Sequence, residues 1–311
     1  MISIYREYSD LKNIVEKSIV VIGNFDGLHH GHMTVLDYAK SLKKSFDDKI
    51  IVFTFYPHPL KVLRPDHAPK NILSFRNKVM KMNDLGVDIM LAQHFNKNFS
   101  KITAENFVKG ILSEGLKAKH IVIGDDFHFG FKRQGNINYL KSKQLQNNFK
   151  VHIIKEVSRE NIRYSSSLIR EMIVKGKMLE AKMVLGYFYE IEGKVVKGEQ
   201  LGREIGFPTA NIHYLNTIIP EDGVYAGWVS VNNKYYKSAI STGYRPQFKG
   251  KKRFLEAYIL NFSGDIYGTR IKVSLVKKIR NEEVFSNIDE LKKQMNLDCK
   301  KAIKILEENK I

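Results

Sequence analysis

The order of apolar runs between residues 18 and 175 constrains the fold of this chain more than any other feature. Short apolar runs typical of buried strands alternate there with segments whose apolar residues recur at helical spacing. The runs that indicate strands are SIVVI, IIVFTF, DIMLAQHF, HIVIG and VHIIKEV. Runs such as IIVFTF and HIVIG lack strict alternation of polar and apolar residues, as strands covered on both faces do. Strands that alternate with helices predict βαβ units and a parallel sheet with right-handed crossovers.

The pattern changes near residue 184. Residues 186–279 contain short alternating strands separated by turn signals such as Asn232-Asn233, and these predict a closed or nearly closed antiparallel barrel. The segment 287–311 has helical apolar spacing and is expected to pack on that barrel. The sequence therefore predicts class α/β plus β, with a parallel sheet and helices over residues 1–184 and a barrel with a terminal helix over residues 185–311.

The charge of the chain is strongly positive, with 51 Lys and Arg against 33 Asp and Glu in 311 residues. Nucleic-acid binding is one interpretation, but the lysines are spread along the whole chain without a long basic block, an RNP motif or a zinc-finger pattern. That spread favours small anionic substrates and no nucleic-acid partner. The polar N-terminus, the single Cys299 and the lack of an apolar stretch of about 20 residues favour a cytoplasmic protein that does not enter a membrane.

The first candidate site is the stretch GNFDGLHHGH, residues 23–32, between the first strand of the parallel sheet and a helix. Ligands bind at the carboxyl ends of such strands, and a helix N-terminus favours anions. The spacing of His29 and His32 places two imidazoles beside the helix start, where they can donate hydrogen bonds to phosphate oxygens. Such fixed donors stabilise the charge that develops on a transferring phosphoryl group.

A second segment, Ser165-Ser166-Ser167 followed by Arg170, offers matching chemistry. Its hydroxyls cap a predicted helix, which taken alone is most often a plain helix start. Two anion-facing helix starts in one α/β domain nevertheless favour phosphate binding. The sequence contains neither GxxxxGK[ST] nor GxGxxG, so the site is neither a P-loop nor the usual dinucleotide fingerprint.

These residues carry a resemblance to a known family. GNFDGLHHGH together with YSSSLIR resembles the HxGH and SSTxxxR-type signature of nucleotidylyltransferases, and more narrowly the FMN adenylyltransferase module of the bacterial bifunctional riboflavin kinase/FAD synthetase family. FTFYPHP and IGDDFHFGFKRQGN resemble two further segments of that module. The resemblance implies a Rossmann-like nucleotidylyltransferase domain in which His29 and His32 hold ATP phosphates and the transition state. It further implies a nucleotide site lined by Gly23, Asn24, Phe25 and Asp26, phosphate contacts from Ser166, Ser167 and Arg170, and flavin and adenine pockets shaped by Pro57, His58, Pro59 and Asp126.

The second candidate site is LGREIGFPTANIHYL, residues 201–215. Thr209 and Asn211 offer two oxygen ligands on one face of an extended stretch, because side chains two residues apart in a strand point the same way. Hard oxygen ligands together with substrate phosphates suit Mg²⁺. In most proteins, the same residues would form only a turn and a strand start.

This segment resembles the GRxxGxPTAN motif of riboflavin kinase, which implies an antiparallel riboflavin-kinase barrel. By that match Gly202 and Arg203 bind nucleotide, Thr209 and Asn211 hold Mg²⁺, and Glu256 is the base that activates the ribityl hydroxyl of riboflavin. The segment IRNEEVF resembles the family's RxExxF segment and places Arg280 near the flavin. Without the resemblance, Glu256 would be interpreted as a surface acid on an edge strand.

The whole chain is therefore expected to phosphorylate riboflavin with ATP to FMN and to adenylylate FMN with a second ATP to FAD and pyrophosphate. Mg²⁺ is the expected cofactor, the partners are the small-molecule substrates, and self-association is left open. Several positions depart from the family pattern, among them Tyr56, His128, Ser241, which replaces an asparagine, and Gln247. The substitutions at Tyr56, Ser241 and Gln247 support the alternative that only one of the two modules is active. The charge of +18 supports the other alternative, a nucleic-acid-binding protein on a nucleotidyltransferase scaffold.

Overall fold

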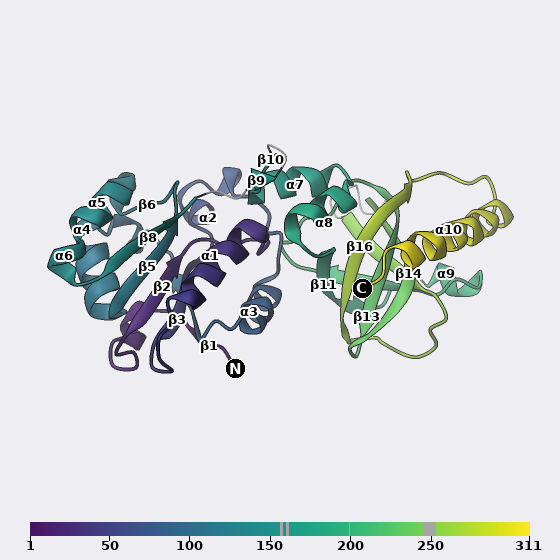
Figure 1. Ribbon diagram of the computed structural model, residues 1–311. Coiled ribbons are helices and arrows are strands. Elements are labelled where there is room, and N and C mark those ends of the chain that lie inside the picture. The colour runs from purple at the N-terminus through teal and green to yellow at the C-terminus, as the bar shows by residue number, and fades with distance from the viewer. Residues whose placement is uncertain (156–157, 160–161, 199, 245–252) are drawn as a thin grey trace. The chain divides into compact units, whose positions relative to one another are not determined.

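The structure is a computed structural model that describes residues 1–155, 158–159, 162–198, 200–244 and 253–311 (Figure 1). Among the departures from the family pattern named above, Gln247 lies outside the described residues. The chain forms two compact units. We call them the sheet unit, made of Met1–Pro69 and Phe75–Tyr164, and the barrel unit, made of Lys70–Ser74 and Ser165–Ile311.

The sheet unit is built on a six-stranded parallel sheet in the order β1-β4-β3-β2-β5-β8. The strands are β1 Ser3–Tyr5, β2 Ser18–Ile22, β3 Lys49–Tyr56, β4 Ile89–His94, β5 Ala118–Gly124 and β8 Lys150–Ile154. The predicted parallel sheet is thus confirmed, with the short edge strand β1 in addition. Because β3 and β5 flank β2 on opposite sides, the strand order reverses at β2, and such a switch point opens a crevice at the carboxyl end of the strands.

Helices connect these strands, and α1 packs on β2 and β5 (Figure 1). Thr103 is the N-cap residue of α4, and its hydroxyl accepts a hydrogen bond from the Asn106 backbone N–H at 3.2 Å. The helices are α1 His30–Ser41, α2 Pro59–Leu63, α3 Phe75–Asp84, α4 Ala104–Asn106 with its π-helical continuation Phe107–Gly115, α5 Ile137–Ser142 and α6 Gln144–Asn147. Short 3₁₀ turns lie at Tyr8–Leu11, Pro65–His67, Phe99–Lys101 and Phe131–Arg133, and two small hairpins pair β6 His128–Phe129 with β7 Gly135–Asn136 and β9 Ser158–Arg159 with β10 Ile162–Arg163.

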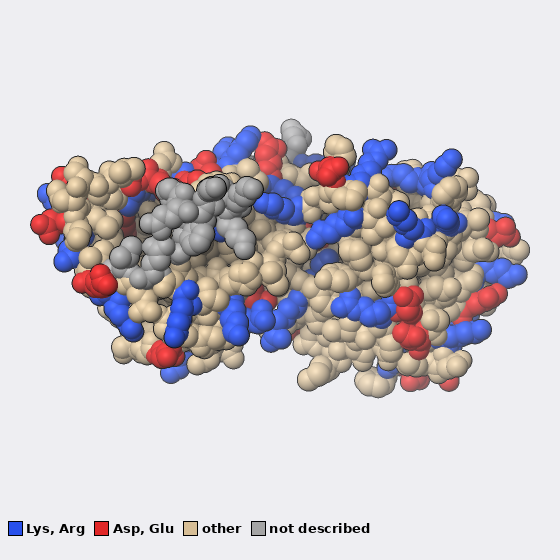
Figure 2. Space-filling view, turned by 180° about the vertical axis from the view of Figure 1, so that it is seen from behind, with Lys and Arg blue, Asp and Glu red and all other residues tan. Residues whose placement is uncertain are grey.

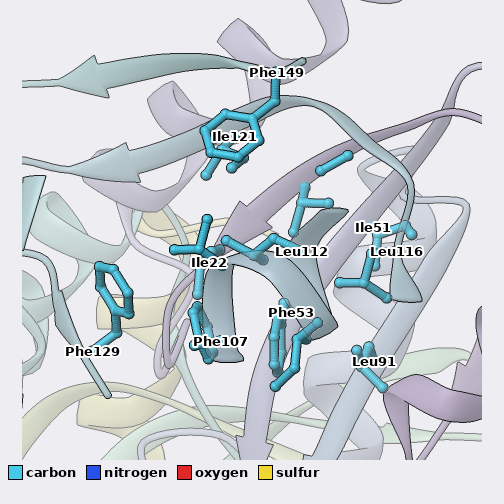
Figure 3. Close-up of a cluster of buried hydrophobic side chains, with 14 of the residues drawn as sticks. Ile22, Ile51, Phe53, Leu91, Phe107, Leu112, Leu116, Ile121, Phe129 and Phe149 are labelled. Carbon is cyan, nitrogen blue, oxygen red and sulfur yellow. The ribbon is translucent and has the colours of Figure 1, made fainter. Parts of the chain in front are cut away.

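The core of the sheet unit lies between the sheet and the α4 segment (Figure 3). Phe53 of β3 stacks on Phe107, with ring centroids 5.7 Å apart, and Ile22 at the end of β2 belongs to the same buried cluster. Burying one such side chain is worth roughly 1.5–3 kcal/mol. The end of β2, from which the first candidate site departs, is therefore anchored in a buried core.

The barrel unit contains a closed antiparallel barrel in the order β11-β12-β15-β14-β13-β16. Its strands are β11 Tyr189–Val196, β12 Thr209–Tyr214, β13 Gly223–Val231, β14 Lys234–Tyr244, β15 Arg253–Ile259 and β16 Arg270–Arg280, and its helices are α7 Ser166–Val174, α8 Met178–Leu185, α9 Leu201–Glu204 and α10 Ile288–Glu308. The predicted turn at Asn232-Asn233 joins β13 to β14 with positive φ at both residues, as a two-residue hairpin requires. The predicted terminal helix is α10, whose Ala302 and Leu306 pack against Ala226 and Val276 of the barrel.

The helices α7 and α8 belong to the compact unit that contains the barrel. The compact units thus divide at residues 164 and 165, and the domain boundary at residue 184 stays a prediction. The segment 70–74 joins the barrel unit through the backbone of Asn71, which bonds to Asn216 and to Ile218 at 3.1 Å each.

The surface and the helices give two further findings. No helix among the described residues is long and apolar enough to cross a membrane. On the face drawn in Figure 2, Lys and Arg side chains are separated by uncharged and acidic residues rather than gathered in one block.

Candidate active sites

The loop from Gly23 to His29 leaves the carboxyl end of β2 in a strained conformation. Phe25 and Leu28 have φ of 48° and 41°, values that side chains other than glycine rarely adopt. Both side chains are almost completely buried, at 2% and 1% exposure. Strain of this kind costs on the order of 1–3 kcal/mol per residue and persists only where the surroundings impose it. The burial of these two side chains therefore fixes the loop backbone in one shape.

The loop ends on two stacked imidazoles. His29 is the N-cap residue of α1 and its ring lies on that of His32, with centroids 3.7 Å apart and planes inclined by 24°. Gly31 lies between them, and a Cβ there would be 3.1 Å from the His29 ring, so a larger residue would press on that imidazole. The Nδ1 atoms of both rings are buried and have no hydrogen-bond partner among the described residues. The two predicted histidines are thus brought together beside a helix N-terminus.

Burial controls the charge of this histidine pair. It lowers the pKa of His29 to about 4, an effect that His30 reinforces and Asp26 opposes. It also lowers the pKa of His32 well below its usual range, with smaller contributions from His29 and Lys78. Both imidazoles are therefore neutral at neutral pH, and each keeps one N–H donor and one acceptor nitrogen. Such a pair supplies fixed hydrogen-bond donors in a buried, anion-favouring position without positive charge of its own.

The predicted nucleotide residue Asn24 is held from three sides. Its carbonyl oxygen accepts hydrogen bonds from the Lys78 ammonium at 2.7 Å and from the Thr54 hydroxyl at 3.3 Å. Its side-chain amide lies 3.3 Å from Nε2 of His58. Because Nδ1 of His58 accepts the Leu60 backbone N–H at 3.2 Å, a neutral His58 carries its proton on Nε2. The Asn24 side chain can accept that proton only if its amide oxygen, rather than its amide nitrogen, faces His58. The hydrogen-bond network decides between these two orientations of the amide.

His58 therefore caps α2 as well as facing Asn24, and both its role and that of Pro57 towards flavin stay predictions. Asp126 lies in the turn after β5, 78% exposed, and its carboxylate is 3.8 Å from the Arg163 guanidinium. Tyr56, one of the departures from the family pattern, forms part of a cation–π arrangement. The Arg6 guanidinium lies 4.7 Å from the Tyr56 ring centroid and 4.5 Å from that of Phe75.

The serine segment begins α7, but the residue that caps the helix is Ser165. Its hydroxyl accepts a hydrogen bond from the Leu168 backbone N–H at 3.2 Å. Ser166 and Ser167 are the first two helical residues, and Nε of Arg170 donates to the Lys70 carbonyl at 3.0 Å. All these residues belong to the barrel unit, whereas the histidine pair belongs to the sheet unit. The phosphate contacts of Ser166, Ser167 and Arg170 stay predictions.

The second candidate site is assembled by strand register. β12 pairs with β15 so that Asn211 lies opposite Glu256, and β14 places Ser241 opposite the same glutamate. Thr209, two residues before Asn211, donates its hydroxyl to the Glu256 carboxylate at 3.4 Å. Because directly opposed side chains share a face, these oxygen-bearing groups form one cluster.

This cluster lies on the outer face of the barrel wall. The alternate residues Ile240, Leu255 and Ala257 are buried, whereas Glu256 is half-buried. Glu256 does not lie on an edge strand, since β15 is paired on both sides in a closed barrel. Ser241 is a cross-strand neighbour of the proposed base, so this departure from the family pattern falls inside the site.

The residues present fit a hard divalent cation. A hydroxyl and an amide oxygen from Thr209 and Asn211 lie on one face beside a carboxylate, and such oxygens are the ligands that Mg²⁺ prefers. A Cβ on Gly198 would collide with the Asn211 amide, so a larger residue there would displace that amide. Gly202 and Arg203 lie in the α9 turn, which closes through a 2.7 Å hydrogen bond from the Phe207 N–H to the Gly202 carbonyl. Their nucleotide contacts stay predictions.

Arg280 has a structural partner that sequence reasoning missed. Its guanidinium donates to both oxygens of Asp298 on α10 at 2.8–3.1 Å and to the Asn281 carbonyl at 2.9 Å. The Asp298 side chain is only 4% exposed and also accepts a hydrogen bond from Gln294. Arg280 therefore fastens the terminal helix to β16, and its predicted contact with flavin stays a prediction. The signal available in the sequence was an acidic residue, Asp298, on the face of the terminal helix that packs against the barrel.

Two family models match different parts of the chain. A family model described as FAD synthetase matches residues 11–168, and one described as riboflavin kinase matches residues 185–306. The chain is 40% identical to a bifunctional riboflavin kinase/FMN adenylyltransferase of Buchnera aphidicola, over 94% of this chain and 95% of that protein. It is 35% identical to the protein of that description from Escherichia coli K12, over 91% of each chain.

A solved structure described as a macrolide-efflux protein from Streptococcus pneumoniae matches with a TM-score of 0.85 and 30% identity, covering 100% of this chain and 99% of that one. That likeness extends over both units of the fold. The two family models cover most of the chain, and the curated relatives span nearly its whole length. The chain therefore belongs to the family of bifunctional riboflavin kinase/FMN adenylyltransferases.

Proposed function

We propose that this chain makes both flavin nucleotides, with one reaction in each unit. The barrel unit transfers the γ-phosphoryl group of ATP to riboflavin, giving FMN and ADP. The sheet unit transfers AMP from a second ATP to the FMN phosphate, giving FAD and pyrophosphate. The observation that carries the proposal is that each unit holds its own group of reactive residues: a stacked neutral imidazole pair in one, and a carboxylate beside two uncharged oxygen ligands in the other.

In the barrel, Glu256 accepts the proton of the riboflavin 5′-hydroxyl as that oxygen attacks the γ-phosphorus and ADP leaves. A carboxylate suits this role when it lies within hydrogen-bond reach of the hydroxyl. The Thr209 hydroxyl, 3.4 Å from the carboxylate, restricts its orientation. Thr209 and Asn211 would hold Mg²⁺, which when bound neutralises charge on the phosphates.

In the sheet unit, an oxygen of the FMN phosphate attacks the α-phosphorus of ATP, and the bond from that phosphorus to pyrophosphate breaks. The rings of His29 and His32 are fixed by stacking on each other, and His29 is also buried, so their N–H donors need no reorganisation to bond to phosphate oxygens. No residue has to form a covalent intermediate. Positioning and charge stabilisation carry the reaction.

The test separates the two activities in one full-length protein. Purified His32→Asn and Glu256→Gln variants are incubated with ATP and Mg²⁺, once with riboflavin and once with FMN, and the flavins are separated by chromatography. We expect His32→Asn to make FMN but no FAD, and Glu256→Gln to make FAD from supplied FMN but no FMN from riboflavin. A folded single variant that loses both activities would contradict two independent sites. A wild-type protein that performs only one reaction would support the alternative of one active module.

A further inference from the structure

A lysine outside every motif of the sequence lies against the first candidate site. Lys78 is a half-buried residue of α3, 54 residues after Asn24 in the chain. Its ammonium donates to the Asn24 carbonyl at 2.7 Å, and its charge is close enough to His32 to contribute to the lowered pKa of that imidazole. The helix therefore brings a positive charge to the loop that carries the histidine pair.

The reaction in this unit needs such a charge. The leaving pyrophosphate gains negative charge as the bond to the α-phosphorus breaks, and cationic side chains are the usual protein groups that stabilise it. The histidine pair is neutral, so it supplies donors but not charge. Asp26, buried at 6% exposure in the same loop, is an acidic residue and does not offset a phosphate. A lysine ammonium has three donors on a flexible stem, so a bond to one carbonyl is compatible with a further bond to a phosphate oxygen.

We propose that Lys78 is a ligand of the ATP phosphate chain in the adenylyltransferase site and stabilises the departing pyrophosphate. This inference rests on the proposed function of the sheet unit and adds a residue to it. The competing explanation is that Lys78 only braces the loop through the Asn24 carbonyl. The two explanations require different properties of the side chain. Holding the loop requires a hydrogen-bond donor, whereas stabilising the phosphate requires a positive charge.

Two substitutions separate the requirements. Lys78→Gln keeps a neutral donor that can bond to the Asn24 carbonyl and removes the charge, and Lys78→Arg keeps the charge. Lys109→Gln is the matched control, because Lys109 is exposed in the same unit and the variant has the same net charge as Lys78→Gln. We expect Lys78→Gln to lose about a hundredfold in the rate of FAD formation from FMN, the effect of removing one strong electrostatic contact. Lys78→Arg should retain more activity, and FMN formation from riboflavin should be unchanged in all three variants.

A second readout does not depend on turnover. Hydrogen exchange of the peptides covering residues 23–41 is measured on the full chain with and without inorganic pyrophosphate and Mg²⁺. We expect pyrophosphate to protect these peptides in wild type and in Lys109→Gln, and to leave them unprotected at the same concentration in Lys78→Gln. Protection of Lys78→Gln equal to that of wild type would overturn the proposal, even if FAD formation is lost, because Lys78 would then be only a brace. If wild type makes no FAD, the proposed function fails, and the pyrophosphate measurement still decides whether Lys78 binds phosphate.

Discussion

The buried neutral state of His29 makes the stability of the sheet unit depend on pH. The imidazole is 5% exposed, and burial lowers its pKa from 6.5 to about 4. The unfolded chain therefore binds a proton on this residue more readily than the folded chain. The stabilising contribution of neutral His29 is complete above pH 6.5 and is lost as the pH falls from 6.5 towards 4. The perturbation that exposes this effect is His29→Gln, which leaves no titrating group at that position.

The magnitude follows from the shift of the pKa. A fall from 6.5 to about 4 corresponds to about 3 kcal/mol once the pH reaches the folded value, and to about 2 kcal/mol between pH 7.5 and pH 5. The free energy of unfolding of wild type minus that of His29→Gln should therefore fall by about 2 kcal/mol over that interval. Burial lowers the pKa of His32 well below its usual range, so His32 stays neutral in both folded proteins and its contribution cancels.

The assay has to report on the sheet unit alone. Trp228, the single tryptophan of the chain, lies in β13. Its fluorescence therefore reports the unfolding of the barrel unit and cannot be used for the sheet unit. Native-state hydrogen exchange of the β2 and β3 amides measures the opening of the sheet unit directly. A comparison of wild type and variant at the same pH cancels the intrinsic pH dependence of exchange. His67→Gln, which removes an exposed imidazole in the same unit, is the control.

A constant difference between wild type and His29→Gln from pH 7.5 to pH 5 would refute the reasoning. The imidazole would then be accessible to water or paired in a way that stabilises its charged form. The barrel peptides should show no difference between the two proteins at any pH. If they did, the two units would not respond independently, and the assignment of the effect to His29 would fail.

Two further predictions concern the barrel unit. Asp298→Ala should lower the free energy of unfolding of the barrel unit by about 3–5 kcal/mol, because the substitution leaves the mostly buried Arg280 guanidinium without the Asp298 carboxylate. The measurement is denaturation followed by tryptophan fluorescence. A loss under about 1 kcal/mol would mean that the pair behaves as an exposed ion pair. Thr209→Val keeps the shape of the side chain but removes the hydroxyl. It should reduce FMN formation and raise the Mg²⁺ concentration that FMN formation requires, while FAD formation from FMN is unchanged. Thr209→Ser should retain most of the activity, and a valine variant with normal Mg²⁺ dependence would exclude Thr209 as a metal ligand.

Local patterns predicted the elements that carry buried apolar runs. The strands around β2 are such runs, and their alternation with helices determined a parallel sheet. The edge strand β1 escaped prediction because its three residues are too few and too exposed to show a period. The π-helix Phe107–Gly115 was predicted only as a helix, since an apolar face does not distinguish i to i+4 from i to i+5 hydrogen bonding.

The candidate sites divide in the same way. His29 and His32 were predictable because three residues of chain and a helix start bring them together. The role of Lys78 was not predictable, since nothing in the sequence distinguishes it from any other lysine on an amphipathic helix. Only tertiary packing brings Lys78 to Asn24. The partnership of Arg280 with Asp298 was missed for the same reason, because β16 and α10 meet only in the folded barrel unit.

Strand register gives the substitution at Ser241 a definite physical meaning. Any residue at that position lies directly opposite Glu256, because the pairing of β14 with β15 is continuous from Ser238 to Tyr244. A serine in place of the family's asparagine shortens the side chain but keeps a hydroxyl that can donate to a carboxylate. The site therefore loses reach on this side of the proposed base rather than its hydrogen-bonding character. Since Asn211 and Thr209 contact or face Glu256 from the opposite strand, the arrangement of the proposed base with the proposed metal ligands does not depend on Ser241. This favours a working kinase over the alternative in which the barrel is inactive.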